Sequence, residues 1–320
     1  MVWPIPAPRR LPTDHRPIVS FIPALSLGSE LGVGTMLRVS LYEEISFALS
    51  DGYAACGRYF AAVGAPCGAV LYHHGIQSHC GWYETSAQRL AESGFHVLQW
   101  DRRGSGRNER DRGHADSAPQ LIADAHAARD ELVRRSGSVN HHVIGISWGG
   151  KLAVAAYVED PKNVVSLSLV TPGLFPLVGV SKAEMAKIGF AMLYEPHQDF
   201  RIPLDDPDMF TSNSDWQEFI RTDALTLRRC TASFYLASRR MDRMIQRLAD
   251  SPPAPLHMLL ADNERIIDND KTRQFVRALP WKNCRITTYA EARHSLEFEN
   301  DPEVYFGDLI AFIRAANQGS

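Results

Sequence analysis

The chain has 320 residues, of which 45% are hydrophobic and 22% charged, and its formal net charge is −3 at pH 7. This composition is typical of a soluble globular protein and excludes a disordered tail, a collagen-like chain and a coiled coil. The slight negative charge gives no indication of a nucleic-acid partner, which would normally bring a basic domain or stripe. The length corresponds to about two domains, or to one large domain with an insertion.

Residues 1–40 are predicted to form a proline-rich arm without regular structure. Six prolines lie within the first 23 residues, and each of them fixes φ and lacks a backbone donor. We expect the apolar residues of this arm to pack on the main body or on a second subunit, as in a homodimer. The N-terminus lacks the basic start and the apolar core of a signal peptide, and no stretch predicts a membrane-spanning helix.

From residue 41 the sequence alternates between strand and helix patterns. A hairpin is predicted where Ile45, Phe47 and Leu49 share one face and Asp51-Gly52 makes a turn. Further strands are expected at 68–72, 95–100, 143–146, 164–170, 256–260 and 284–289. Helices are expected at 82–93, 118–135, 149–159, 271–278 and 302–315. Such alternation indicates an α/β architecture, with a mostly parallel sheet and helices on both of its faces.

The alternation fails between residues 173 and 250, where helices are expected at 216–225 and 227–248. A helical insertion between two late strands predicts a cap over the C-terminal edge of the sheet, which is where open α/β sheets bind ligands. We therefore expect a core formed by residues 41–172 and 251–320, and a helical cap formed by residues 173–250.

A short motif lies between a predicted strand and a predicted helix, where residues 145–149 read GISWG. It matches G-x-S-x-G, the nucleophile elbow, in which small residues flank the serine because the turn is strained and crowded. Residues 145–151 also nearly match a phosphate-binding loop, G-x-x-x-x-G-K. That loop needs Ser or Thr next to hold Mg²⁺, but the residue is Leu152. The sequence therefore favours the elbow, with Ser147 as the nucleophile.

A serine nucleophile needs a base, and elbow hydrolases carry serine, acid and histidine in that chain order. Downstream of Ser147 the histidines are His197, His257 and His294. His197 lies in the predicted cap and His257 inside an apolar strand, whereas His294 lies in a short polar loop. A mobile polar base belongs in such a loop, so we expect His294 to be the base.

The acid that orients the base should follow the strand at 256–260, where the candidates are Asp262, Glu264 and Asp268. Glu264 precedes a short apolar step, as elbow hydrolases require, and is the predicted acid. Asp262 and Asp268 stay open as alternatives, although the first is placed to bond turn amides and the second to cap the next helix. Glutamate serves as well as aspartate, because the acid holds the imidazole and offsets its charge.

The oxyanion hole is expected to take one backbone N–H from Trp148 and another from Ile76. Residues 73–76 read HHGI after a predicted strand, and Gly75 allows the tight turn that would face the N–H of Ile76 toward the site. We expect His74 to hold this loop. Adjacent strand-end residues point in opposite directions, which disfavours a metal site at residues 73–74. No metal or organic cofactor is expected.

With these motifs the sequence resembles the monoacylglycerol lipase and lysophospholipase branch of the α/β-hydrolases, over about residues 43–315. The resemblance is carried by His74-Gly75, Gly81-Trp82-Tyr83, the DRRGSG run at 101–106, the elbow, and His294 with residues 295–297. It implies an α/β-hydrolase fold in which the run at 101–106 is structural. This sequence has Trp148 where the branch commonly has Met, and we expect the bulky ring to narrow or reshape the acyl pocket.

The predicted function is that of a serine hydrolase that cleaves a carboxylic ester through an acyl-enzyme. The resemblance implies a lipid-like small-molecule substrate of the monoacylglycerol or lysophospholipid type. The alternatives are a hydrolase of an amide, a thioester or a carbon–carbon bond on the same fold, or a catalytically silent binding protein.

Two further features bear on location and surface. The cysteines are five in number and form no CxxC pair, so they indicate reduced thiols in a cytoplasmic protein, although spacing alone leaves a Cys56–Cys67 bridge open. The stretch from Arg102 to Arg112 mixes arginines with acidic residues. We expect a solvated loop with internal ion pairs there, with an anion-binding role as the alternative.

Overall fold

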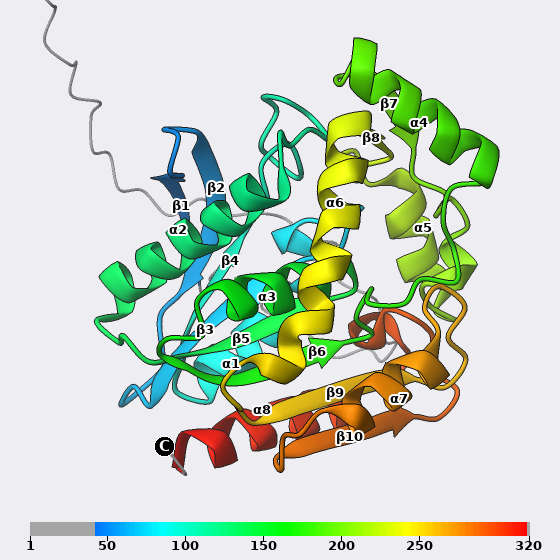
Figure 1. Cartoon of the computed structure of the whole chain (residues 1–320). Helices are drawn as coiled ribbons and strands as arrows, with labels where there is room; N and C mark the ends of the chain where they lie inside the picture. The colour runs from blue at the N-terminus through cyan, green and yellow to red at the C-terminus, as the bar shows by residue number, and fades with distance from the viewer. Residues whose placement is uncertain (1–41, 319–320) are drawn as a thin grey trace, which may run out of the picture.

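The computed structural model describes residues 42–318, so the predicted proline-rich arm lies outside the described residues. Its centre is an eight-stranded sheet with strand order β1-β2-β4-β3-β5-β6-β9-β10 (Figure 1). The strands of this sheet are β1 (Tyr42–Ala48), β2 (Ala54–Phe60), β3 (Gly68–His73), β4 (Phe95–Trp100), β5 (His141–Ile146), β6 (Val164–Val170), β9 (Leu256–Ala261) and β10 (Cys284–Tyr289). All neighbours from β4 to β10 pair in parallel, whereas β2 pairs antiparallel with β1 and β4. The predicted α/β architecture is confirmed.

Helices cover both faces of the sheet. They are α1 (Glu84–Glu92), α2 (Ala118–Ser136), α3 (Trp148–Glu159), α7 (Asn269–Ala278) and α8 (Glu303–Gln318). Helix α2 packs on α3 over one face, and α1 contacts α8 on the other. The first predicted helix begins later than expected, because Cys80–Tyr83 forms a 3₁₀ turn, η1, before α1.

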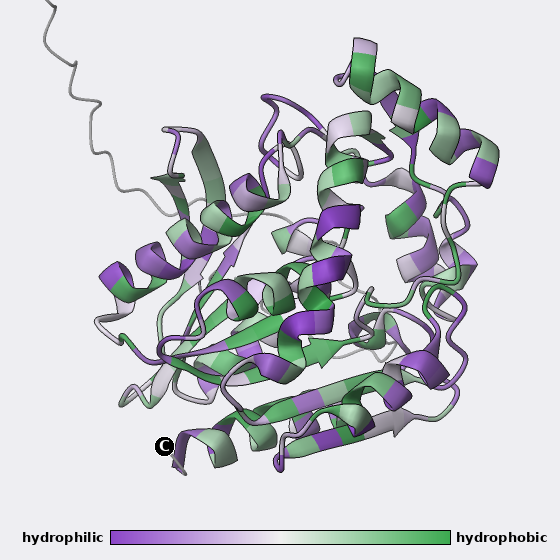
Figure 2. Ribbon diagram, in the orientation of Figure 1, coloured by the Kyte–Doolittle hydropathy of each residue, from purple (hydrophilic) through white to green (hydrophobic). Residues whose placement is uncertain are grey.

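Local signals explain where these elements begin and end. Ser117 caps α2 by accepting a hydrogen bond from Gln120 N, and Gly137 ends the helix at φ +71°, which is a conformation that glycine adopts without strain. Every residue of β5 and β9 is buried, as expected for parallel strands covered on both faces. Figure 2 shows these central strands mostly in green, whereas the ribbon of α2 carries several purple segments.

The segment between β6 and β9 contains α4 (Lys182–Tyr194), β7 (Asp199–Arg201), η2 (Pro207–Met209), α5 (Ser214–Thr222), β8 (Arg229–Thr231), α6 (Ala232–Ile245) and η3 (Gln246–Asp250). It contacts loops at the C-terminal ends of the core strands, since Leu227 N donates to Gln77 O and Ser295 N donates to Phe210 O. Buried side chains of α6, such as Phe234 and Met241, belong to the same hydrophobic cluster as the sheet. The division into core and cap at residues 172/173 and 250/251 stays a prediction.

The prediction of a helix over residues 227–248 is wrong for its first residues. Residues 229–231 form β8, which pairs antiparallel with β7 in a small second sheet. Thr231 then caps α6 through its side chain, which accepts from Phe234 N. Threonine is β-branched and is a good N-cap residue, so it favours this change from strand to helix over a helix that continues through it.

The cysteines agree with the expectation of reduced thiols, whereas the expectation for the arginines needs correction. All five cysteines are free, so the Cys56–Cys67 bridge is absent. The basic stretch is not uniformly solvated, because Arg102 and Arg103 are buried. Arg103 forms its ion pairs with Asp124 and Asp51. None of the described helices combines the length and the apolar character needed to cross a membrane.

Candidate active site

Ser147 lies in the turn between β5 and α3 with φ +52° and ψ −123°, a strained conformation for a residue with a side chain. The turn is crowded on both sides of the serine. A Cβ on Gly145 would lie 2.7 Å from Gly149 O, and a Cβ on Gly149 would lie 2.2 Å from His73 O. Both flanking glycines are therefore required by the local geometry, which presents the Ser147 side chain at the C-terminal edge of the sheet.

His294 faces this serine from the loop after β10. Its Nε2 lies 2.9 Å from Ser147 Oγ, and only 2% of the residue is exposed. The backbone of the loop is fixed from two sides, because Thr171 Oγ1 donates to His294 O and Ser295 N donates to Phe210 O. The histidine is thus held at hydrogen-bonding distance from the serine hydroxyl.

Glu264 completes a continuous row of hydrogen bonds. Its Oε2 lies 2.9 Å from His294 Nδ1, and its Oε1 accepts from Ile266 N at 2.8 Å. Burial by itself raises the pKa of Glu264, but the imidazole and the backbone donors outweigh this and hold the pKa below its ordinary value. The ionised carboxylate can only accept hydrogen bonds, so Nδ1 of His294 carries the proton. Nε2 of His294 is then free to accept a hydrogen bond from the Ser147 hydroxyl.

The alternative acids and histidines lie elsewhere. Asp268 caps α7 by accepting from Lys271 N at 3.0 Å, and Asp262 is exposed on the turn after β9. His257 is buried in β9 and bonds Thr287 Oγ1, while His197 stacks on His114 at a ring distance of 4.0 Å. Among the predicted candidates, the structure brings Ser147, His294 and Glu264 together.

The loop after β3 lies directly against the serine. A Cβ on Gly75 would be 3.4 Å from Ser147 Cβ, and Ile76 lines the same pocket as Ser147 and His294. His74 holds this loop, since its Nδ1 bonds Gly75 O at 2.8 Å and its Nε2 accepts from Arg102 N at 3.0 Å. Burial lowers the pKa of His74 to about 3, so the ring is neutral and fits these two roles.

Trp148 follows the nucleophile and opens α3. As the first residue of the helix, its N–H has no partner within the helix. Its ring stacks on Phe234 at 5.2 Å and donates from Nε1 to Ser238 Oγ at 2.9 Å. The residues that line the pocket at Ser147 do not include Trp148. The ring packs against α6, and its expected effect on the shape of the acyl pocket stays a prediction.

A second buried cluster was not predicted from the sequence. Asp223, which ends α5, accepts from Trp82 Nε1 at 2.8 Å and lies 3.0 Å from His79 Nε2. Burial alone raises the pKa of Asp223, but these partners lower it well below its ordinary value. The cluster joins the β6–β9 segment to η1 across 144 residues of chain, and no motif indicates a contact over that separation.

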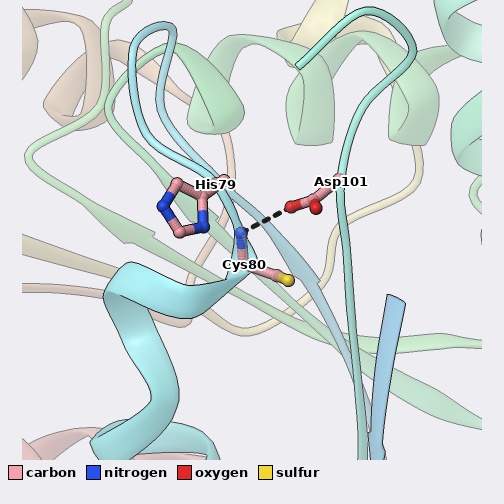
Figure 3. Close-up of side chains that lie close together, drawn as sticks. All are labelled: His79, Cys80 and Asp101. Atoms are coloured by element: carbon pink, nitrogen blue, oxygen red, sulfur yellow. Dashed lines mark hydrogen bonds between the residues drawn. The ribbon is translucent and has the colours of Figure 1, made fainter. Parts of the chain in front are cut away.

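One group among the described residues has a composition suited to a metal ion, namely His79, Cys80 and Asp101 (Figure 3). The ligand atoms of two members already have partners, since Asp101 accepts from Cys80 N and Arg107 N, and Gly81 N donates to His79 Nδ1. Burial raises the pKa of the Cys80 thiol well above its ordinary value, whereas metals bind the thiolate. These residues do not fit a metal and serve as structural partners of the backbone.

The sheet order, the strained serine at the end of β5 and the histidine after β10 define an α/β-hydrolase. The model of the serine aminopeptidase S33 family matches residues 64–301, and the chain belongs to that family. Within it, the similarity is to the monoacylglycerol lipase branch, and the chain is a lipase- or esterase-like hydrolase.

Relatives and solved structures agree with this placement. The chain is 24% identical to phospholipase YtpA of Bacillus subtilis over 255 residues, covering 77% of this chain and 95% of that protein. It is 22% identical to a monoacylglycerol lipase of Mycolicibacterium smegmatis over 251 residues, covering 78% and 88%. The crystal structure of a monoacylglycerol lipase from Paleococcus ferrophilus shares the fold with a TM-score of 0.74 at 20% identity, covering 82% of this chain and 99% of that chain.

Proposed function

We propose that this protein hydrolyses carboxylic esters through an acyl-enzyme formed on Ser147. The observation that carries the proposal is the continuous row of contacts from Glu264 through His294 to Ser147 at a strained elbow. In the first step Ser147 Oγ attacks the ester carbonyl carbon and its proton passes to His294 Nε2. Glu264 holds Nδ1–H and offsets the positive charge that the imidazole gains.

The negative charge on the carbonyl oxygen is bound by the N–H groups of Ile76 and Trp148. Such donors, fixed before the reaction, stabilise the tetrahedral intermediate without reorganisation. The intermediate collapses when His294 returns its proton to the leaving alcohol, which leaves the acyl group on Ser147. Water, deprotonated by His294, then releases the carboxylic acid and restores the serine.

The substrate that fits best is an ester with an apolar acyl group and a polar alcohol. The pocket at Ser147 is lined by apolar side chains, including Leu204 and Phe210, and by the polar side chains of Gln77 and Ser78. The Gln77 amide is buried and has no hydrogen-bond partner among the described residues. The relatives named as monoacylglycerol lipase and phospholipase act on esters of this kind, which supports a lipid-like substrate.

Location and assembly remain predictions from the sequence. Five free cysteines are compatible with a reducing compartment and support the prediction of a cytoplasmic protein. The predicted homodimer rests on the apolar residues of the proline-rich arm, and size-exclusion chromatography with and without residues 1–40 would test it.

Hydrolysis of p-nitrophenyl esters with acyl chains of two to sixteen carbons, together with a monoacylglycerol, tests the proposed function. Wild-type protein should release the acid, and Ser147→Ala should lose at least about three orders of magnitude in kcat, because the nucleophilic oxygen is absent. Circular dichroism should show an unchanged fold. Near-full turnover by Ser147→Ala would contradict the assignment of the nucleophile. A wild type that hydrolyses thioesters or amides but none of these esters would contradict the proposed substrate class.

A further inference from the structure

Arg102 carries a buried positive charge close to the candidate active site. It follows β4 by two positions, and 2% of the residue is exposed. The ion pairs formed among residues 42–318 do not include it, whereas Arg103 pairs with Asp124 and Arg107 with Glu44. Burial lowers the pKa of Arg102 to about 10, so the guanidinium is still charged at neutral pH.

A buried charge without a counter-ion needs other compensation. The Arg102 guanidinium lies 4.5 Å from the centre of the Trp148 ring and 5.2 Å from that of Phe234, which are distances for favourable cation–π contacts. Its Nη1 donates to Gly75 O at 3.3 Å and its Nη2 donates to Ile76 O at 3.1 Å. The compensation therefore comes from two aromatic faces and two carbonyls of the loop after β3.

The contact with Gly75 O bears directly on the proposed oxyanion hole. The carbonyl of Gly75 and the N–H of Ile76 belong to the same peptide group, which is planar and trans, so the two bonds point in opposite directions. A donor that holds the oxygen in place thereby fixes the direction of the N–H. His74 Nδ1 contacts the same oxygen at 2.8 Å, and donors on a carbonyl also polarise the peptide and strengthen its N–H as a donor.

The second proposed oxyanion donor is also in contact with Arg102. Trp148, whose N–H opens α3, places its ring against the guanidinium and against Phe234 of α6. One cation thus contacts the side chain of one donor residue and the backbone of the other. It also connects both to the segment between β6 and β9.

We propose that Arg102 is a positioning residue of the oxyanion hole. It fixes the Ile76 peptide and the Trp148 side chain, and its positive charge, which no ion pair within residues 42–318 neutralises, favours the developing oxyanion. This inference rests on the proposed function. Loss of a direct oxyanion donor lowers kcat by about 10²–10³. Arg102 acts through its neighbours, so we expect a smaller factor of roughly 10–100 in kcat.

The test compares Arg102→Met and Arg102→Lys with Arg107→Met. Methionine keeps much of the length and removes the charge and both hydrogen bonds. Lysine keeps the charge but lacks the planar fork that reaches two carbonyls. Arg107 belongs to the same loop, pairs with Glu44 and donates to Gly57 O, so it is a matched arginine without contact to the residues of the hole.

Two inhibitors separate positioning from a merely structural role. Ser147 Oγ adds to the carbonyl carbon of an alkyl trifluoromethyl ketone and forms an oxyanion, whereas a dialkyl ether of matched length has no carbonyl and binds without forming one. Arg102→Met should lower kcat by about 10–100-fold with KM within about threefold, and should weaken ketone binding by the same factor as kcat. Ether binding should change by less than about twofold. In Arg102→Lys, kcat should fall by about 3–10-fold, and in Arg107→Met it should fall by less than about twofold.

The inference is overturned if Arg102→Met retains wild-type kcat, or if ketone and ether binding weaken equally. Should Arg102→Met fail to fold, Arg102→Lys decides, since wild-type kcat and ketone affinity in that variant would contradict the need for the two-carbonyl fork. The proposed function fails in a different way. In that case the wild-type protein itself would neither hydrolyse the ester nor form the ketone adduct.

Discussion

At the scale of single residues, Glu264 illustrates how a carboxylate is placed for one task. Its two oxygens divide their contacts, with Oε2 on His294 and Oε1 mainly on the backbone N–H groups that follow it. The backbone donors keep the carboxylate in one orientation, which in turn fixes the imidazole. Asp268 lies four residues later, and its side chain caps α7 and pairs with the Lys271 ammonium.

Glu264→Gln should lower kcat by about 10²–10⁴. The amide has nearly the same shape but no negative charge to hold Nδ1–H and offset the imidazolium. The matched control is Asp268→Asn, which should leave kcat within about twofold, since asparagine is also a good N-cap. Ester hydrolysis by purified variants checks both. A larger loss in Asp268→Asn than in Glu264→Gln would move the assignment of the acid to Asp268.

Residue-scale prediction from sequence depended on motifs and chain order. Ser147 could be predicted as the nucleophile because the strained turn demands flanking glycines. His294 could be predicted as the base because only three histidines follow Ser147 in the sequence. The contacts of Asp223 and Arg102 could not be predicted in this way. Their partners lie far away in the sequence, and side-chain contacts between separate loops leave no periodicity behind.

At the scale of elements, a buried carboxyl links η4 (Leu296–Phe298) to the first turn of α1. Glu297 Oε1 accepts from Ser86 N at 2.9 Å and Oε2 accepts from Ser86 Oγ at 2.7 Å. Burial outweighs these donors and raises the pKa of Glu297 from 4.5 to about 7. The folded state therefore favours the protonated form. The contribution of this group to stability is full below pH 4.5 and is lost as the pH rises through about 7.

Glu297→Gln removes this titration. The free energy of unfolding of the variant minus that of the wild type should therefore rise between pH 4.5 and about 7, by up to roughly 3 kcal/mol. Urea unfolding at several pH values measures this difference. Glu303→Gln, at a carboxyl that is 61% exposed at the start of α8, is the control and should give no such rise. A difference that stays flat or falls with pH in Glu297→Gln would contradict the account.

Strands and helices with a clear hydrophobic pattern could be predicted from the sequence. Short elements, in which helix and strand preferences compete, could not. The short, mostly apolar segments at 143–146 and 256–260 are bounded by turn signals and are typical of buried parallel strands. Residues 229–231 look helical with their neighbours, but they pair with β7, and a pairing partner of three residues carries almost no sequence signal.

At the scale of the whole molecule, the segment between β6 and β9 is not an independent lobe. Many of its buried side chains join the hydrophobic cluster of the sheet, although a second, smaller cluster lies around Ile188 and Phe200. Leu204 and Phe210 line the pocket at Ser147. By contrast, Leu193 on α4 is 76% exposed. The same segment thus provides part of the core and part of the pocket wall.

We expect Leu204→Ala to change the preference for acyl chain length, because it removes an apolar side chain from the pocket wall. The ratio of kcat/KM for p-nitrophenyl dodecanoate to that for the butyrate should shift by about fivefold or more, since one methylene contact in an apolar pocket is worth about 1–3 kcal/mol. Leu193→Ala is the matched control and should leave the ratio unchanged. An unchanged ratio in Leu204→Ala would show that this part of the segment does not contact the acyl chain.

The central claim is that Ser147 is an activated nucleophile. Its most direct test is the intact mass of the protein after reaction with an alkyl fluorophosphonate, followed by peptide mapping of the adduct. We expect one adduct per chain, located on Ser147, absent from Ser147→Ala and formed far more slowly in Glu264→Gln. No adduct on the folded wild-type protein, or an adduct on another residue that persists in Ser147→Ala, would contradict it.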